Sequence, residues 1–262
     1  MGNMKHLKYS FQTLAAICAL FSVLLTACSG VSEEKLVSRE SAIALMESGD
    51  LEGAVTVFND LVKEAKKVTE FELDILKYRG EAEFLLEDYE AALHTYRTLM
   101  EVDKERPEYC YMASIALAKD GQRHDAKLFL DSGKALDKDS QAPMFYQASV
   151  AYAESCMAAG EDMTATGIYQ ELIDGGFANT DLYNRLVMAA VNEGKYEEAL
   201  ELIKKGLTLT DTMAVQELKF NEAVCYEYLG EFSKALELFR YYIEEFGNDE
   251  RAAHEITFLE TR

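Results

Sequence analysis

The chain has 262 residues, of which 49% are hydrophobic, and a formal net charge of −21 at pH 7. The hydrophobic fraction excludes a disordered tail, because enough apolar surface is present to form a core. Only two prolines and 15 glycines occur over this length, which favours an all-helical body over collagen-like or proline-rich structure. The acidic surplus argues against a nucleic-acid partner, since phosphate binding needs a basic surface.

Residues 1–27 have the organisation of a secretory signal peptide. Lys5 and Lys8 give a positive N-terminal region, and residues 14–25 form an apolar run interrupted only by Ser22. This run is shorter than the roughly 20 residues that a permanent helical span needs. Because residues 1–27 contribute two lysines and no acidic residue, the rest of the chain carries 24 basic and 47 acidic residues.

The segment Leu25-Thr26-Ala27-Cys28 resembles the lipobox of bacterial lipoproteins. The resemblance implies diacylglyceryl transfer to the Cys28 thiol, cleavage after Ala27 and further acylation, for example with palmitate. Two or three acyl chains hold a protein stably on a membrane, whereas one chain does not. Residues 28–35 would then be a lipidated tether. The alternatives are an ordinary signal peptide, in which Cys28 is incidental, and an uncleaved N-terminal helix.

Such a lipid would place the protein at the cell envelope. The expected location is the extracytoplasmic face of the plasma membrane, or the outer membrane if the cell has one. The membrane is therefore an expected partner through the Cys28 lipid.

One pattern occurs six times after the tether. Each copy has a central alanine, a glycine or glutamate five residues before it, and a large apolar residue four residues after it. The residue twelve positions before the alanine is small in five of the six copies. The alanines are Ala54, Ala92, Ala126, Ala165, Ala199 and Ala235, spaced by 34 to 39 residues. The large residues are Phe58, Tyr96, Leu130, Tyr169, Ile203 and Phe239.

This pattern predicts a two-helix hairpin. The two small positions let the helix backbones approach each other, and the large residue one turn later fills the space beside them. Glycine supplies a left-handed turn at the end of the first helix, with Glu87 as the one exception among the six copies. A single hairpin leaves its apolar stripe uncovered, so successive hairpins must stack.

The repeat resembles the tetratricopeptide repeat family, most clearly in the Gly-x-Tyr/Phe-x-x-Ala cores that begin at Gly194 and Gly230. The resemblance implies an all-α, right-handed α-solenoid of about six hairpins over residues 36–262. The repeats are expected at residues 36–68, 73–106, 107–139, 146–178, 180–212 and 216–248, with a capping helix at 249–262. Armadillo and HEAT units have a similar period but lack the glycine-to-alanine interval.

No catalytic or metal-binding motif stands out. The three histidines beyond residue 27 fall on different repeats, and none belongs to a zinc, metalloprotease or nucleophile-elbow motif. The many carboxylates follow exposed helix faces, and nothing identifies a pair suited to acid–base chemistry. We therefore expect a protein without enzymatic activity, cofactor or metal. A hydrolase that uses one of these carboxylates is the alternative.

Three cysteines lie within the repeats, at Cys110, Cys156 and Cys225. Their odd number, wide spacing and apolar neighbours indicate buried free thiols that pack as small hydrophobic residues. A single disulfide is the alternative for an exported protein.

Candidate binding residues lie on the first helix of each repeat. In the tetratricopeptide repeat family these helices line a concave groove that commonly binds extended peptides or partner helices. Counting 7, 8, 11 and 15 residues back from each alanine gives the corresponding positions here. They include Arg39, Lys77, Glu81, Phe84, Tyr111, Glu154, Met157, Asn184, Met188, Asn192, Phe220, Glu227 and Tyr228.

This set contains aromatic, methionine and acidic residues, which suit a basic or amphipathic partner segment. Lys77 and Asn184 are similar to residues of the family's carboxylate clamp, but they lie on different repeats. A register shifted by one residue would instead turn the apolar members toward neighbouring helices.

Together these features predict a membrane-anchored, extracytoplasmic scaffold without enzymatic activity. It would bind a peptide or a segment of another envelope or secreted protein in its groove. A lipoprotein receptor for a small secreted peptide or glycan fragment is the alternative.

Overall fold

The computed structural model describes residues 31–262, and every regular element within that range is helical. Residues 1–30, which include the predicted signal peptide and Cys28, lie outside the described residues. The chain divides into two compact units at Asp103 and Lys104. The all-α class predicted from the sequence is confirmed.

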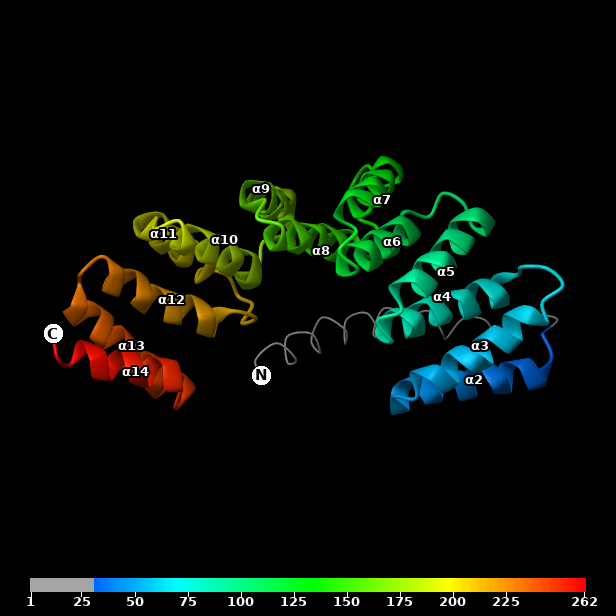
Figure 1. Cartoon of the computed structure of the whole chain (residues 1–262), viewed down its shortest axis with the longest axis horizontal. Coiled ribbons are helices and arrows are strands. Elements are labelled where there is room, and N and C mark those ends of the chain that lie inside the picture. Colours follow the sequence, from blue (N-terminus) through cyan, green and yellow to red (C-terminus); the bar gives the residue numbers. More distant parts are fainter. Residues whose placement is uncertain (1–30) are drawn as a thin grey trace. The chain divides into compact units, whose positions relative to one another are not determined.

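The first unit contains two consecutive helical hairpins (Figure 1). Its helices are α2 (Glu33–Ser48), α3 (Leu51–Lys63), α4 (Glu70–Leu85) and α5 (Tyr89–Val102). Aspartates cap the second helix of each hairpin: Asp50 accepts a hydrogen bond from the backbone N–H of Gly53 at 3.0 Å, and Asp88 accepts one from that of Ala91 at 3.1 Å. These caps pair N–H groups that the first turn of a helix leaves free.

The second unit contains four further hairpins and a final helix that packs on α13. The first two hairpins are α6 (Pro107–Lys119) with α7 (Arg123–Leu136) and α8 (Phe145–Ala158) with α9 (Asp162–Leu172), which a π-helical turn, η1 (Ile173–Phe177), extends. The next two are α10 (Thr180–Asn192) with α11 (Tyr196–Gly206) and α12 (Val215–Tyr228) with α13 (Phe232–Phe246). The final helix is α14 (Glu250–Leu259).

The repeated positions mark the crossings of the six hairpins. All six alanines of the pattern have 0% exposure, and the large residues four positions later have at most 2%. The small residues twelve positions before the alanines are buried as well. The predicted packing of small residues beside one large residue is thus confirmed in five copies, and in the copy around Ala199 the larger Val187 is buried at the same position.

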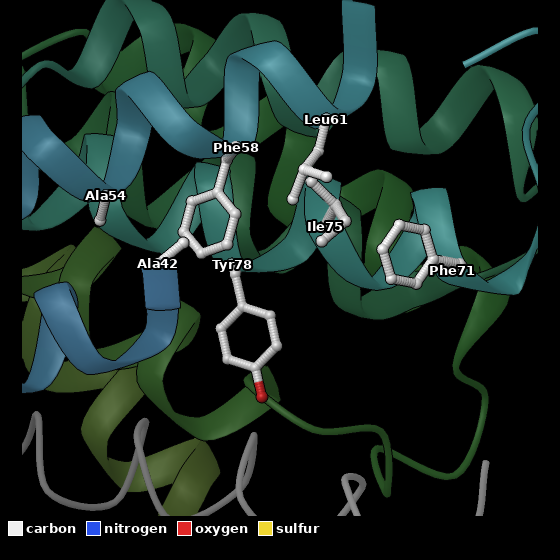
Figure 2. Close-up of a cluster of buried hydrophobic side chains, with 7 residues drawn as sticks. All are labelled: Ala42, Ala54, Phe58, Leu61, Phe71, Ile75 and Tyr78. Carbon is white, nitrogen blue, oxygen red and sulfur yellow. The ribbon is translucent and has the colours of Figure 1, made fainter. Parts of the chain in front are cut away.

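Figure 2 shows this packing in the first unit, where the Phe58 ring of α3 lies beside Ala42 of α2. Phe58 also stacks on Tyr78 of α4, with ring centroids 6.0 Å apart and planes 12° from parallel. Full burial of one such ring stabilises the fold by roughly 2–3 kcal/mol. Phe58 therefore joins the first hairpin to the first helix of the second.

The turns between paired helices share one conformation. The N–H that follows the left-handed residue bonds to the carbonyl five residues earlier, as in Asp50 to Leu45 at 2.9 Å and Lys195 to Ala190 at 2.8 Å. This arrangement closes the end of a helix and needs a positive φ. Five copies supply it with glycine, and Glu87 adopts a φ of 61° in the sixth. The position at which the sequence departs from its pattern thus keeps the same backbone.

All three cysteines of the repeats are buried, and their thiols are free. Burial raises the pKa of the Cys225 thiol to about 11. Within residues 31–262, no helix has both the length and the apolar composition needed to cross a bilayer.

Candidate partner-binding surface

The predicted binding residues of the first unit are largely engaged in packing. Arg39 forms an ion pair with Asp74 of α4, with 2.7 Å between Nε and Oδ2, and its guanidinium lies 5.8 Å from the Tyr78 ring centroid. Glu81 and Phe84 are buried, and Lys77, on the same helix, is half-buried.

Tyr111 of α6 is expected from the sequence to line an open surface, but its side chain is completely buried. Its hydroxyl donates a hydrogen bond to Asp137 Oδ2 at 3.1 Å. Its ring lies so close to α7 that a Cβ added at Gly133 would be 2.5 Å from Tyr111 Cε1. Gly133 thus makes room for the ring inside the hairpin, and Tyr111 belongs to the core.

Ion pairs join the first helices of three repeats in the second unit. Glu154 of α8 forms an ion pair with Arg185 of α10, with 3.0 Å to Nη1, and another with Lys119 of α6, with 3.2 Å to Nζ. Arg185 also pairs with Asp181, with 2.8 Å between Nε and Oδ2, and lies over the Tyr169 ring. Burial alone would lower the pKa of Arg185, but Asp181 and Glu154 outweigh it and raise that pKa. The guanidinium is therefore a fixed cation.

A second polar contact joins α10 to α12. Asn184, which is buried, accepts a hydrogen bond from Asn221 Nδ2 at 2.9 Å. One turn later on α10, Met188 is 52% exposed, and Asn192 at the end of the helix is exposed as well. The amide pair therefore holds the two helices together beneath an exposed methionine.

Tyr228 at the end of α12 is the most exposed aromatic of the predicted set, with 64% of its surface accessible. Its ring stacks on Tyr196 of α11, with centroids 4.9 Å apart and planes 8° from parallel. Phe220, earlier on α12, is half-buried, and the Arg251 guanidinium lies 4.5 Å from its ring centroid. Burial raises the pKa of Glu227, and the nearby Glu255 carboxylate raises it further.

Seven residues of the predicted set remain at least partly accessible on α8, α10 and α12, and Phe220 and Glu227 are two of them, held by the contacts just described. The other five form one set. We call them the first-helix surface: Glu154, Met157, Met188, Asn192 and Tyr228. Sequence reasoning missed Arg185, the cation that fixes Glu154. Arg185 directly follows the predicted position Asn184, so a search of adjacent helix positions for charges opposite to Glu154 would find it.

The part of the chain that the structure describes offers no group of three or more histidine, cysteine, aspartate or glutamate side chains placed to hold a metal ion. The first-helix surface contains exposed apolar side chains, Met188 and Tyr228, and one acidic side chain, Glu154, that ion pairs fix.

Family comparisons recognise the repeats directly. Two tetratricopeptide repeat family models match this chain, one over residues 39–106 and the other over residues 180–212. Tetratricopeptide repeats are therefore present in the first unit and in the α10–α11 hairpin. No curated protein matches the sequence.

Solved structures share the fold over most of the chain. A tetratricopeptide repeat protein from Parabacteroides merdae is 18% identical, with a TM-score of 0.54, and the match covers 86% of this chain and 84% of that one. PilW, a type IV pilus biogenesis factor, is 14% identical with a TM-score of 0.59, and the match covers 87% of this chain and 99% of PilW. MamA from Desulfovibrio magneticus is 16% identical with a TM-score of 0.54, and the match covers 68% of this chain and 96% of the MamA chain.

These likenesses establish the architecture, a series of packed helix pairs of the tetratricopeptide-repeat type. The fold is consistent with a protein–protein interaction scaffold, and the repeats point to protein partners.

Proposed function

We propose that this protein is a lipid-anchored, extracytoplasmic scaffold whose first-helix surface binds a segment of a partner polypeptide. The observation that carries the proposal is the exposure of Met188 and Tyr228, two large apolar side chains on the first helices of adjacent repeats. Exposed methionine and aromatic side chains are typical anchors of protein interfaces.

The polar groups beneath these anchors are already fixed. Arg185 holds Glu154 on one side of Met188, and the Asn184–Asn221 contact holds α10 against α12 on the other. A surface whose side chains are ordered before binding loses less conformational entropy when the partner arrives. The arrangement therefore favours a specific contact over a loose apolar one.

Charge defines the partner further. Residues 104–262 carry 29 acidic and 16 basic residues. A basic or amphipathic segment would be attracted to this unit and would place its apolar side chains on Met188 and Tyr228. The partner proposed is thus a basic, amphipathic segment of an envelope or secreted protein.

The anchor rests on the lipobox resemblance at Cys28. In the structure α2 begins at Glu33. The hydroxyl of its N-cap residue, Ser32, accepts a hydrogen bond from the backbone N–H of Lys35 at 3.4 Å. The tether expected over residues 28–35 is therefore shorter, with four residues between Cys28 and the helix. Four extended residues reach roughly 14 Å, so the first hairpin would work close to the membrane.

Photo-crosslinking in intact cells tests the surface. A photoreactive amino acid would replace Met188 or Tyr228 in the full chain, and matched controls would carry it at Met163 or Tyr241. The controls are also exposed apolar residues, at 88% and 56%, but they lie on the second helices α9 and α13. We expect one discrete adduct from positions 188 and 228 only. Equal adducts from all four positions, or adducts from the controls alone, would refute the assignment of this surface.

A further inference from the structure

A cavity of about 410 Å³ lies in the second unit and shares no residue with the first-helix surface. It is open on one side and is lined by the end of α7, the connection at residues 137–140, the first half of α8, the end of α9 and η1. Pockets for small ligands usually have volumes of several hundred cubic ångströms and apolar walls with a few polar groups.

One side of this cavity is apolar, and the rest of its lining is polar or charged. Phe145 of α8 and Leu172 of α9 are both buried, and Ile168 and Phe177 lie beside them. The Phe145 and Phe177 ring centroids are 5.4 Å apart. This apolar side would receive an aliphatic or aromatic group.

One of the polar lining groups is a buried hydroxyl on α8. Ser149 lines the cavity one turn after Phe145 and is 1% exposed. Its Oγ has no hydrogen-bond partner among the described residues. Buried polar atoms are nearly always paired, so an unpaired hydroxyl beside a cavity indicates a polar group that an occupant supplies.

Two lysines, Lys134 and Lys138, also line the cavity, and Lys134 lies beside the apolar side. Lys134 Nζ is 5.8 Å from the Phe145 ring centroid, and Lys134 has no ion pair within the described part of the chain. Asp137, which also lines the cavity, accepts hydrogen bonds from the Tyr111 hydroxyl and from the N–H groups of Gln141 and Ala142. The Asp137 carboxylate is thus occupied, and Lys134 can pair with an incoming anion.

We propose that this cavity binds a small apolar group that ends in a carboxylate. The apolar part would lie on Phe145 and Leu172, the carboxylate would pair with Lys134, and a polar atom would bond to the Ser149 hydroxyl. Asp139 and Glu171 also line the cavity and limit the ligand to one negative charge. The same chemistry is found in a free carboxylic acid and in the C-terminus of a peptide that ends in an apolar residue.

Calorimetric titration of the purified full chain with 3-phenylpropionate tests the proposal. The amide and the amine of the same skeleton serve as neutral and cationic controls. We expect the carboxylate to bind most tightly. A short peptide ending in phenylalanine, with a free or an amidated C-terminus, separates the two sources, because only the free terminus should bind if the cavity takes peptide ends.

Two variants locate the binding site. Lys134→Met keeps the apolar stem but removes the charge, and Ser149→Ala removes only the hydroxyl; each should weaken carboxylate binding by roughly fivefold. Lys205→Met, an exposed lysine outside the cavity, should leave it unchanged. The Ser149→Ala variant should also have a melting temperature no lower than that of the parent, because the hydroxyl that it lacks has no hydrogen-bond partner. Tighter binding of the amine, absence of binding by both carboxylate probes, or unchanged affinity in both cavity variants would overturn the proposal.

Discussion

The Tyr96 hydroxyl donates a hydrogen bond to the Gly80 carbonyl oxygen at 3.0 Å, between the two helices of the second hairpin. Tyr96 is the large residue four positions after Ala92, and Gly80 is the small residue twelve positions before it. At this crossing the two positions require each other, because the Tyr96 ring that reaches the Gly80 carbonyl leaves no room for a Cβ at residue 80.

Gly80→Ala is expected to destabilise the fold by about 1–3 kcal/mol. A Cβ at residue 80 would lie 2.6 Å from Tyr96 Cε1, so the ring must move. Gly167 of α9 is the matched control, since a Cβ there meets nothing within 4 Å. Gly167→Ala should stabilise the fold by about 0.5–1 kcal/mol, because alanine has the better helix propensity. Urea unfolding followed by circular dichroism measures both, and equal effects of the two substitutions would contradict the packing account.

Glu87→Gly is expected to raise stability by about 1 kcal/mol. Glu87 is exposed and adopts a positive φ of 61°, which a side chain with a Cβ disfavours. The opposite change, Gly194→Ala at the equivalent turn with a φ of 73°, should lower stability by a similar amount. Thermal denaturation of the two variants gives the comparison. A Glu87→Gly variant that melts below the parent would show that the glutamate has a stabilising role of its own.

Arg185→Met should destabilise the second unit by about 1–2 kcal/mol, because it leaves Glu154 and Asp181 without their shared cation. Adding Glu154→Gln to this variant should recover part of the loss. Lys127→Met removes an exposed ion pair with Asp131 and should change stability by less than about 0.5 kcal/mol. Chemical unfolding of the three variants tests the contrast. Similar losses of stability in the Arg185 and Lys127 variants would argue against a stabilising network of ion pairs around Arg185.

Asp249→Asn should destabilise the fold at pH 7 by about 1 kcal/mol and by clearly less at pH 2, where part of the contribution of the carboxylate is already lost. Hydrogen bonds from Arg251, and from the Tyr242 hydroxyl at 2.9 Å, hold the pKa of Asp249 well below its usual range. A carboxyl with a lowered folded-state pKa stabilises the fold above its unfolded-state pKa of about 3.9, and the contribution is lost as the pH falls through the folded-state value. Unfolding midpoints at the two pH values measure this, and a deficit that does not depend on pH would contradict the assigned cause.

Cys28→Ser should move the protein from the detergent phase to the aqueous phase in a phase-separation assay of whole cells. The lipid would be lost, and the described helices lack a membrane-spanning segment. Circular dichroism of the variant should show an unchanged helical fold. A Cys28→Ser protein that stays in the detergent phase would refute the lipid anchor.

The hairpin crossings could be predicted from the sequence because they depend on contacts within one repeat. A small residue, an alanine and a large residue at fixed spacing leave few ways to pack two helices, and even Glu87 keeps the turn. The binding residues were harder to predict, because the exposure of a first-helix residue depends on the neighbouring repeat as well. Tyr111 followed the spacing rule but is buried because Gly133 makes room for its ring.

The cavity near Ser149 could not be predicted from the sequence. A serine on a helix usually bonds to a backbone carbonyl of its own helix, as Ser132 does to Leu128 at 2.7 Å. Whether Ser149 does so depends on its rotamer and on the way α8 packs on α7 after the connection at residues 137–144. No spacing rule describes that connection.

The most direct measurement of the central claim is the affinity of two double variants for the partner crosslinked at position 188. Met188→Ser combined with Tyr228→Ser should weaken binding at least tenfold, because both apolar anchors are lost. Met163→Ser combined with Tyr241→Ser removes the same residue types from the second helices and should leave the affinity unchanged. Equal affinities of the two double variants, or a larger loss in the second, would contradict a partner-binding role for the first-helix surface.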